Sequence, residues 1–174
     1  MSDAYSNYFI GNKTKPFHLS VGAVVLNDND QALCYHFVIS KDKKEVHSLM
    51  RETVEPTTSL EDNLRRGLME EFGAQALIIG FLGAIQSHFK NWEGIEVQKT
   101  TIYFLCRLDK SKPLVKPSKP GIFEGETGHI EWYEMHFLIE KMKNQFKLYQ
   151  KTDYDESIIL ERALNYINKN ENDI

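Results

Sequence analysis

Glu70 and Glu71 form an adjacent pair of carboxylates, and Arg66 precedes them by about one helical turn. Side chains three or four positions apart share one face of a helix, so Arg66 and Glu70 lie together if this segment is helical. Two neighbouring carboxylates at a helix C-terminal end repel one another, and the helix dipole opposes negative charge there. A divalent cation offsets that cost, because Mg²⁺ binds one or two carboxylates together with water and phosphate oxygens. The pattern therefore favours Glu70 and Glu71 as ligands of Mg²⁺ or Mn²⁺.

A purely structural interpretation of this pair is also open. Two glutamates on a solvated helix face are common, and Arg66 would then form only a surface ion pair with Glu70. Successive helical residues turn by ~100°, which places Glu70 well away from the apolar stripe of the segment and Glu71 near its edge. Glu70 is therefore the stronger expected ligand. The stripe recurs every four residues and consists of Leu60, Leu64, Leu68 and Phe72.

Local signals bound the helix that carries these residues. Thr58 and Ser59 are both candidate N-caps, and each has an acid three residues later, Glu61 or Asp62. Gly73 is a natural helix stop. The carboxylate pair thus belongs to the last turn of a helix with defined ends.

The elements around this helix are mostly strands. Apolar and β-branched runs separated by turn residues predict two hairpins, one before the helix and one after it. A charged loop is expected over 40–45. A mixed sheet sandwiched between helices follows, which is an α+β fold. The predicted strands cover 18–26, 32–39, 76–89, 95–108 and 129–133, with a short strand around 8–10, and further helices cover 134–149 and 156–167.

Length and composition indicate one domain over residues 1–174, with a core at about 17–167 and a polar leader at 1–16. The net charge of −4 gives no global basic field, so nucleic acid is not an expected partner. No apolar run approaches the ~20 residues that a membrane span needs. Cys34 and Cys106 lie in apolar, strand-like runs, which predicts reduced core thiols. We expect a cytoplasmic protein without membrane attachment.

The segment RETVEPTTSLEDNLRRGLMEEFGA resembles the Nudix box. That motif reads Gly, five residues, Glu, seven residues, Arg-Glu, an aliphatic, any residue, Glu-Glu, any residue, Gly, an aliphatic. When Gly73 is placed on the second motif glycine, Arg66, Glu70 and Glu71 fall on the motif arginine and the Glu-Glu pair. Three positions depart from the motif: Glu52 stands for the first Gly, Thr58 for the first Glu, and Gly67 for the Glu of Arg-Glu.

The resemblance implies a Nudix fold and a hydrolase dependent on Mg²⁺ or Mn²⁺. Its reaction would be cleavage of the diphosphate bond in a nucleoside diphosphate linked to another group. Arg66 would orient a carboxylate by a bidentate pair. Members of the family often dimerise, so the resemblance allows a homodimer that acts on a small nucleotide-type molecule.

The family's carboxylate at position 67 ligates metal or helps to deprotonate water, and this chain has Gly67 there. Another acid is therefore expected to take that role. Glu126, ahead of Glu124, is the leading candidate because both lie in the acidic loop EGETGH, where some family members supply a catalytic Glu. Glu52 and Glu55 of the box loop are the other candidates.

The second hairpin offers residues for substrate binding. Lys99 could meet a phosphate and Tyr103 could stack on a base. Ordinary strand alternation, with Tyr103 in the core and Lys99 on the surface, is the alternative and is favoured by the sequence alone. The histidines are scattered and are interpreted as structural or surface residues.

Three functions remain open from the sequence. The first is a Nudix-type pyrophosphohydrolase acting on phosphoanhydrides, with an altered box and lowered activity. The second is a Nudix-fold nucleotide-binding or regulatory protein without turnover, suggested by Gly67 and Thr58. The third is a related isomerase, or a pyrophosphatase on non-nucleotide substrates.

Overall fold

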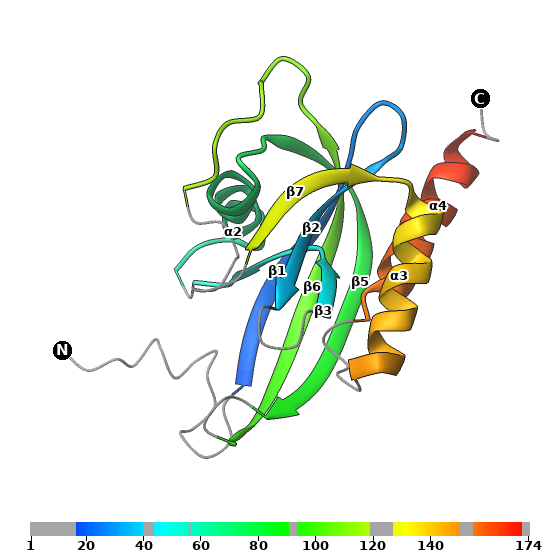
Figure 1. The fold of residues 1–174 in the computed structure, drawn as a ribbon. Coiled ribbons are helices and arrows are strands. Elements are labelled where there is room, and N and C mark those ends of the chain that lie inside the picture. Colours follow the sequence, from blue (N-terminus) through cyan, green and yellow to red (C-terminus); the bar gives the residue numbers. More distant parts are fainter. Residues whose placement is uncertain are drawn as a thin grey trace.

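The computed structural model describes residues 17–39, 44–55, 57–90, 94–118, 127–149 and 155–171. Figure 1 shows a curved sheet with helices on both sides. The strands are β1 (Phe17–Leu26), β2 (Ala32–Ile39), β3 (Lys44–Ser48), β4 (Met50–Thr53), β5 (Ala76–Lys90), β6 (Glu96–Leu108) and β7 (Thr127–Tyr133). The helices are α2 (Leu60–Gly67), the π-helical turn η1 (Leu68–Phe72), α3 (Met135–Tyr149) and α4 (Ser157–Glu171).

The sheet is mixed and is centred on β1. Its strand order is β3-β2-β1-β6-β5, with β4 paired to β1 and β7 paired to β2. The pairing of β1 with β6 is parallel, and the other pairs are antiparallel. Because β4 and β6 occupy the two edges of β1, β2 meets β1 only at Leu26 and Ala32 and then diverges toward β3 and β7. The predicted first hairpin is therefore present but short.

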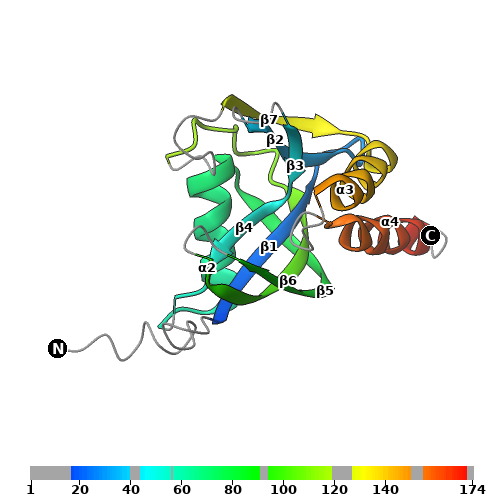
Figure 2. The ribbon, with the colours of Figure 1, turned by 60° about the horizontal axis from the view of Figure 1, so that its bottom comes forward.

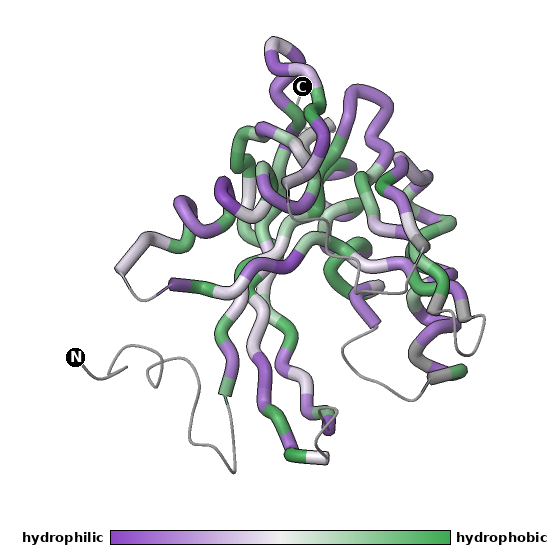
Figure 3. The backbone as a smooth tube through the Cα atoms, turned by 60° about the vertical axis from the view of Figure 1, so that its left-hand side comes forward, coloured by the Kyte–Doolittle hydropathy of each residue, from purple (hydrophilic) through white to green (hydrophobic). Residues whose placement is uncertain are grey.

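Two apolar cores lie on opposite faces of this sheet. Successive strand residues point to opposite sides, so Val25 of β1 packs with Leu64 and Leu68, whereas Val24 packs with Leu138 and Leu160. Helix α2 thus covers one face, and α3 and α4 cover the other (Figure 2). Figure 3 shows hydrophobic stretches on the central strands, and β1 is buried at every position from Ser20 to Leu26, as burial on both faces requires. The predicted α+β fold with a sheet between helices is confirmed.

Most predicted elements are confirmed within a few residues of their limits. The loop expected over 40–45 is an exception, since β3 begins at Lys44 and pairs with β2. The short strand predicted around 8–10 lies outside the described residues. Cys34 and Cys106 are buried free thiols, as predicted. Among the described residues, no helix has both the length and the apolar character to cross a bilayer.

The helix with the carboxylates begins as expected and ends differently. The Ser59 hydroxyl accepts a hydrogen bond from the Asp62 backbone N–H and caps α2. After Gly67 the helix widens into the π turn, which closes at Gly73 in the left-handed region with φ 62°. The Ala74 N–H donates to the Leu68 carbonyl at 3.0 Å across this end. The four-residue stripe predicted a regular α-helix to this point, so the wider last turn is a finding of the structure.

Candidate active site

Positions 52 and 67 face each other where the helix crosses β4. A Cβ placed on Gly67 would lie 2.5 Å from the Glu52 Cβ and 3.0 Å from the Met50 sulfur. The backbone of Gly67 therefore approaches β4 so closely that the contact accommodates one side chain only. Figure 2 shows α2 beside β4 and β4 beside β1. This close contact sets the distance between the carboxylate-bearing helix and β4.

The carboxyl group of Glu71 lies against β4, near the contact between Gly67 and Glu52. It is partly buried, and the backbone N–H of Arg51 on β4 hydrogen-bonds to it. Burial, followed by the negative charge of Glu52, raises the pKa of Glu71 to about 8, against smaller opposing effects from Arg51 and Lys99. Glu71 and Glu52 are therefore neighbouring acids whose ionised forms repel one another, and without a cation Glu71 keeps its proton up to a pH of about 8.

The turn that carries both acids is not the regular α-helix on which the preference for Glu70 over Glu71 was based. Both acids are partly buried, and the Glu71 carboxyl group accepts a hydrogen bond from the Arg51 N–H. The ~100° step assumed a regular α-helix. A π turn bonds residues five apart, which changes the direction of the side chains that follow it.

Tyr35 of β2 holds the π turn in place, and the sequence did not single it out. Its hydroxyl donates to the Glu71 carbonyl at 2.7 Å. Its ring packs edge-on against Phe72 with centroids 4.8 Å apart. The only sequence signal was its place in a strand, because the pairing partner lies 36 residues further along the chain.

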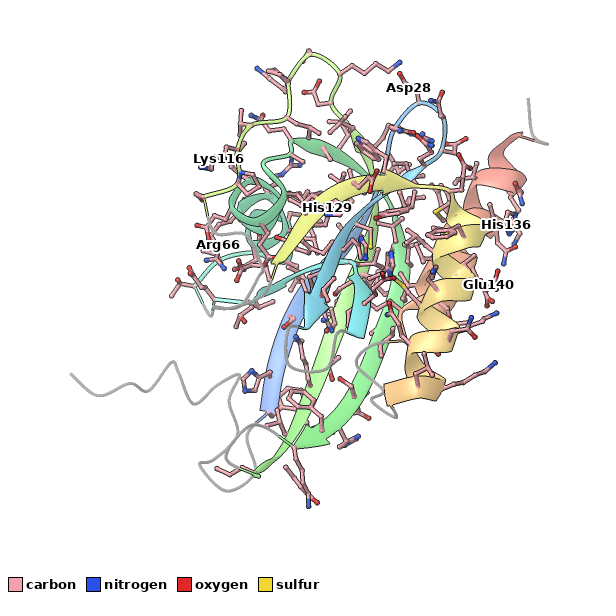
Figure 4. The ribbon with its side chains drawn as sticks, in the orientation of Figure 1. Asp28, Arg66, Lys116, His129, His136 and Glu140 are labelled. Carbon is pink, nitrogen blue, oxygen red and sulfur yellow. The ribbon has the colours of Figure 1, made fainter. Side chains whose placement is uncertain are left out.

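Arg66 belongs to the last turn of α2 and lies on the side of the molecule away from α3 (Figure 4). Its Nη2 is 3.4 Å from Glu52 Oε1 and donates to the Thr53 carbonyl at 2.9 Å. Its Nη1 forms an ion pair with Glu55. The guanidinium thus joins Glu52 of β4 and Glu55 of the loop after it, a geometry that suits the carboxylate-orienting role implied by the resemblance.

Thr58, at the place of the first motif Glu, takes part in the loop structure. Its Oγ1 donates to the Glu55 carbonyl at 3.2 Å and accepts from Asn63 Nδ2 at 2.6 Å. The buried Asn63 also accepts from the Glu55 N–H at 3.0 Å and donates to the Ser59 carbonyl at 2.8 Å. Asn63, which sequence reasoning missed, therefore ties the loop to the helix.

The two expected substrate-binding residues lie in different environments. Glu52 and Glu71 together form what we call the carboxylate surface. Lys99 of β6 is partly buried, and its positive charge lowers the pKa of Glu71, so it lies near that surface. Tyr103 is only 1% exposed, and its hydroxyl donates to Glu156 at 2.5 Å. The structure therefore places Tyr103 in the core, as the strand-alternation alternative had it, and not where a substrate would bind. Glu124 and Glu126 lie outside the described residues.

The carboxylate surface suits a hard divalent cation by the chemistry of its donors. Glu52 and Glu71 supply oxygen ligands, and their mutual repulsion is the condition that a cation relieves. Across the described parts of the chain, no three His, Cys, Asp or Glu side chains converge closely enough to hold a metal by themselves. The fit is therefore to Mg²⁺ or Mn²⁺ held by few carboxylates, with water and phosphate oxygens completing the ligand set.

A cavity of about 220 Å³ beside the same helix contains none of these acids. Its wall mixes one cation with apolar and amide groups. Such a lining offers no carboxylate to a cation, so the cavity is separate from the carboxylate surface. It is lined by Arg65, Leu68, Met69, Ala74, Gln75 and Ala76.

Three histidines that seemed scattered in the sequence form a row across β3, β2 and β7. The rings of His36 and His47 stack with centroids 4.5 Å apart, and His129 meets His36 edge-on at 5.1 Å. Burial, with a smaller effect of His36, lowers the pKa of His47 to about 4. The strand register brings these histidines together although they lie 11 or more residues apart in the sequence, so spacing along the chain could not reveal the row.

Together the features define an α+β domain in which a carboxylate-bearing helix lies on one face of a mixed sheet. The chain belongs to the Nudix family, since the NUDIX domain model matches residues 16–152. The family's members are in general pyrophosphohydrolases that use divalent metal ions. Among solved structures, a NUDIX hydrolase from Nitrosomonas europaea is similar at 17% identity and a TM-score of 0.49, over 72% of this chain and 78% of that chain. A comparison with curated proteins finds no match.

Proposed function

We propose that this protein is a divalent-metal-dependent hydrolase that cleaves the diphosphate bond of a nucleoside diphosphate linked to another group. The observation that carries the proposal is the pair of neighbouring acids, Glu71 and Glu52, on the Nudix helix and β4 with the charge of Lys99 close by. Membership of the Nudix family supports the general class of reaction. The substrate class and the metal requirement are the parts proposed.

Mg²⁺ or Mn²⁺ would be held by Glu70 and Glu71, and it would neutralise phosphate charge and polarise the scissile bond. Lys99 would bind phosphate oxygens as a compact point charge. A water oxygen attacks one phosphorus, the bond from that phosphorus to the bridging oxygen breaks, and the electron pair leaves with the second phosphate. A carboxylate accepts the proton released by the water.

Arg66 is proposed as a positioning residue. It contacts Glu52 and the Thr53 carbonyl of β4 and also Glu55, so it holds the end of this strand and the loop after it against the box helix. Glu126 and Glu124 remain proposed candidates for the base. A catalytic base contributes roughly 10²–10⁴-fold to a rate, so its loss is measurable in a steady-state assay.

The test is phosphate release from a panel of nucleoside diphosphate conjugates with Mg²⁺ or Mn²⁺. We expect Glu71→Gln and Glu70→Gln each to lower kcat/KM by about 10²-fold or more, the order expected when a group acting on the reacting phosphate is lost. Glu61→Gln is the matched control, because Glu61 is an exposed acid of the same helix that pairs only weakly with Arg65. Full activity in both Glu70 and Glu71 variants would remove the metal assignment.

A second candidate is a nucleotide-binding or regulatory protein without turnover. Gly67 and Thr58 favour it, because both positions lack the acid of the motif. Saturable binding of the same conjugates without release of phosphate would select this function. Release of phosphate from non-nucleotide diphosphates alone would instead select a pyrophosphatase of different specificity.

A further inference from the structure

Two of the three departures from the motif are reciprocal. Glu52 is a glutamate where the motif has glycine, and Gly67 is a glycine where the motif has glutamate. The two positions are 15 residues apart in the sequence, yet their side-chain positions meet in the structure. The exchange of residue types therefore takes place across a single contact.

Space, rather than backbone conformation, limits this contact to one side chain. Gly67 has φ −59°, and Glu52 lies in the extended strand β4, so neither position needs the left-handed region. Positive φ among the described residues occurs only at Asp30, Gly73, Gly83 and Gly94. A Cβ on Gly67 would instead lie 2.5 Å from the Glu52 Cβ and 3.1 Å from its Cγ, which is too close for both to exist.

The Glu52 carboxylate is directed and held by its surroundings. Its Oε1 accepts a hydrogen bond from the Thr53 N–H at 2.7 Å and lies 3.4 Å from Arg66 Nη2. The side chain is 18% exposed, so it is accessible from the surface without extending freely into solvent. Its Cβ and Cγ both lie against the position that a Gly67 side chain would occupy, so the side chain leaves β4 on the side of the box helix.

We propose that Glu52 delivers from β4 the carboxylate that the Nudix motif delivers from position 67. The box helix carries Glu70 and Glu71, and Glu52 of β4 lies against the gap that Gly67 leaves. Among the described residues no three acids converge on one point, so water and phosphate oxygens would complete the ligand set of the cation. This assignment rests on the proposed function, because it gives Glu52 a role toward the cation of that site. It also means that the box has transposed an acid rather than lost it.

The first test measures Mn²⁺ binding by the magnetic resonance signal of free Mn²⁺, with phosphate release as a second readout. We expect Glu52→Gln, which keeps the shape of the side chain, to weaken Mn²⁺ binding about tenfold or more, and to lower phosphate release. Glu61→Gln, on an exposed face of α2, should bind Mn²⁺ as the unaltered protein does.

The second test moves the acid back to its motif position. The double variant Glu52→Gly with Gly67→Glu should recover Mn²⁺ affinity to within a few-fold of the unaltered protein. Gly67→Glu alone should lower the unfolding midpoint, because its Cβ would collide with that of Glu52. If the double variant does not fold, the near-isosteric Glu52→Gln decides the matter.

The outcomes separate the two proposals. Unchanged Mn²⁺ binding in Glu52→Gln, alongside lost binding in Glu71→Gln, would overturn the role of Glu52 and leave the proposed function standing. Unaltered protein that neither binds Mn²⁺ nor releases phosphate from any conjugate would overturn the proposed function itself. Loss of binding in Glu52→Gln and its recovery in the folded double variant supports the transposed acid.

Discussion

The raised pKa of Glu71 makes the stability of the metal-free protein depend on pH. The folded protein holds this proton up to pH of about 8, whereas the unfolded chain releases it at about 4.5. Between these values folding takes up a proton, so the free energy of unfolding falls as pH rises. We expect a fall on the order of 2 kcal/mol between pH 5 and 8, since each pKa unit is worth about 1.4 kcal/mol and partial exposure screens the effect.

Urea unfolding in the presence of a chelator measures this dependence. Glu71→Gln should flatten the difference between pH 5 and pH 8, because the amide cannot ionise. Saturating Mg²⁺ should flatten it also, since a bound cation favours the ionised acid. Equal slopes in the unaltered protein and Glu71→Gln would show that this carboxyl group is not the source.

The candidate site residues that sequence analysis could propose were those that lie close together in the chain. Arg66, Glu70 and Glu71 lie within one helical segment, and the motif named them directly. The closeness of Glu52 to position 67 was not accessible, because it depends on the distance between a strand and a helix. Tyr103 illustrates the same limit of sequence analysis, since only the fold reveals that its hydroxyl donates to a buried acid.

At the scale of the element, Gly73 is the residue on which the end of the box helix depends. It has φ 62°, and a Cβ there would lie 1.8 Å from the Val115 carbonyl oxygen. The Val115 N–H also donates to the Gly73 carbonyl at 2.9 Å, so the loop after β6 is fixed against this turn. A side chain at position 73 would therefore meet both backbone strain and a collision.

We expect Gly73→Ala to lower the free energy of unfolding by about 3 kcal/mol, combining ~1 kcal/mol of left-handed strain with the collision. Gly94→Ala is the matched control, because φ is 78° there and nothing lies within 4 Å of the added Cβ. It should cost only the strain, about 1 kcal/mol. Equal losses in chemical denaturation would contradict a role for the Val115 contact.

The helix limits were predictable, and the form of its last turn was not. The cap at Ser59 and the stop at Gly73 are local signals that a single sequence displays. The π turn is held from outside the helix by the Tyr35 hydroxyl, a tertiary contact that leaves no periodic trace. The ends of the helix therefore follow from local sequence signals, whereas the directions of the Glu70 and Glu71 side chains depend on tertiary packing.

At the scale of the whole molecule, Glu156 connects α4 to the strands beneath the carboxylate surface. It is 1% exposed, accepts from the Leu49 N–H at 2.8 Å and from Tyr103, and lies 3.7 Å from Arg51 Nε. Arg51 is also the residue whose backbone N–H bonds to Glu71. Glu156, at the start of the C-terminal helix, and Glu71 of the box helix thus both contact Arg51 of β4.

Glu156→Ala should lower the free energy of unfolding by about 3 kcal/mol, because it leaves the buried Leu49 N–H and the Tyr103 hydroxyl unsatisfied and Arg51 without its acid. Glu161→Ala, which removes from α4 a partly exposed partner of Lys143 of α3, should cost about 0.5 kcal/mol or less. Thermal and urea unfolding provide the comparison. Similar losses in the two variants would argue against the buried network.

The overall architecture was more predictable than its strand connections. Alternating strands and a resemblance to one motif gave the α+β class and the sheet between helices. The parallel pairing of β1 with β6, and the short contact of β1 with β2, required knowledge of which edges were already occupied. Cytoplasmic location and a homodimer stay predictions.

The contact between positions 52 and 67 also constrains how this chain can vary. Restoring glutamate at 67 first crowds two side chains into the space of one, and restoring glycine at 52 first leaves no acid on either side. Each single change is therefore expected to be harmful although the pair of changes is tolerated, which is sign epistasis. A saturation mutagenesis survey of single variants would score both positions as intolerant and miss that they are interchangeable.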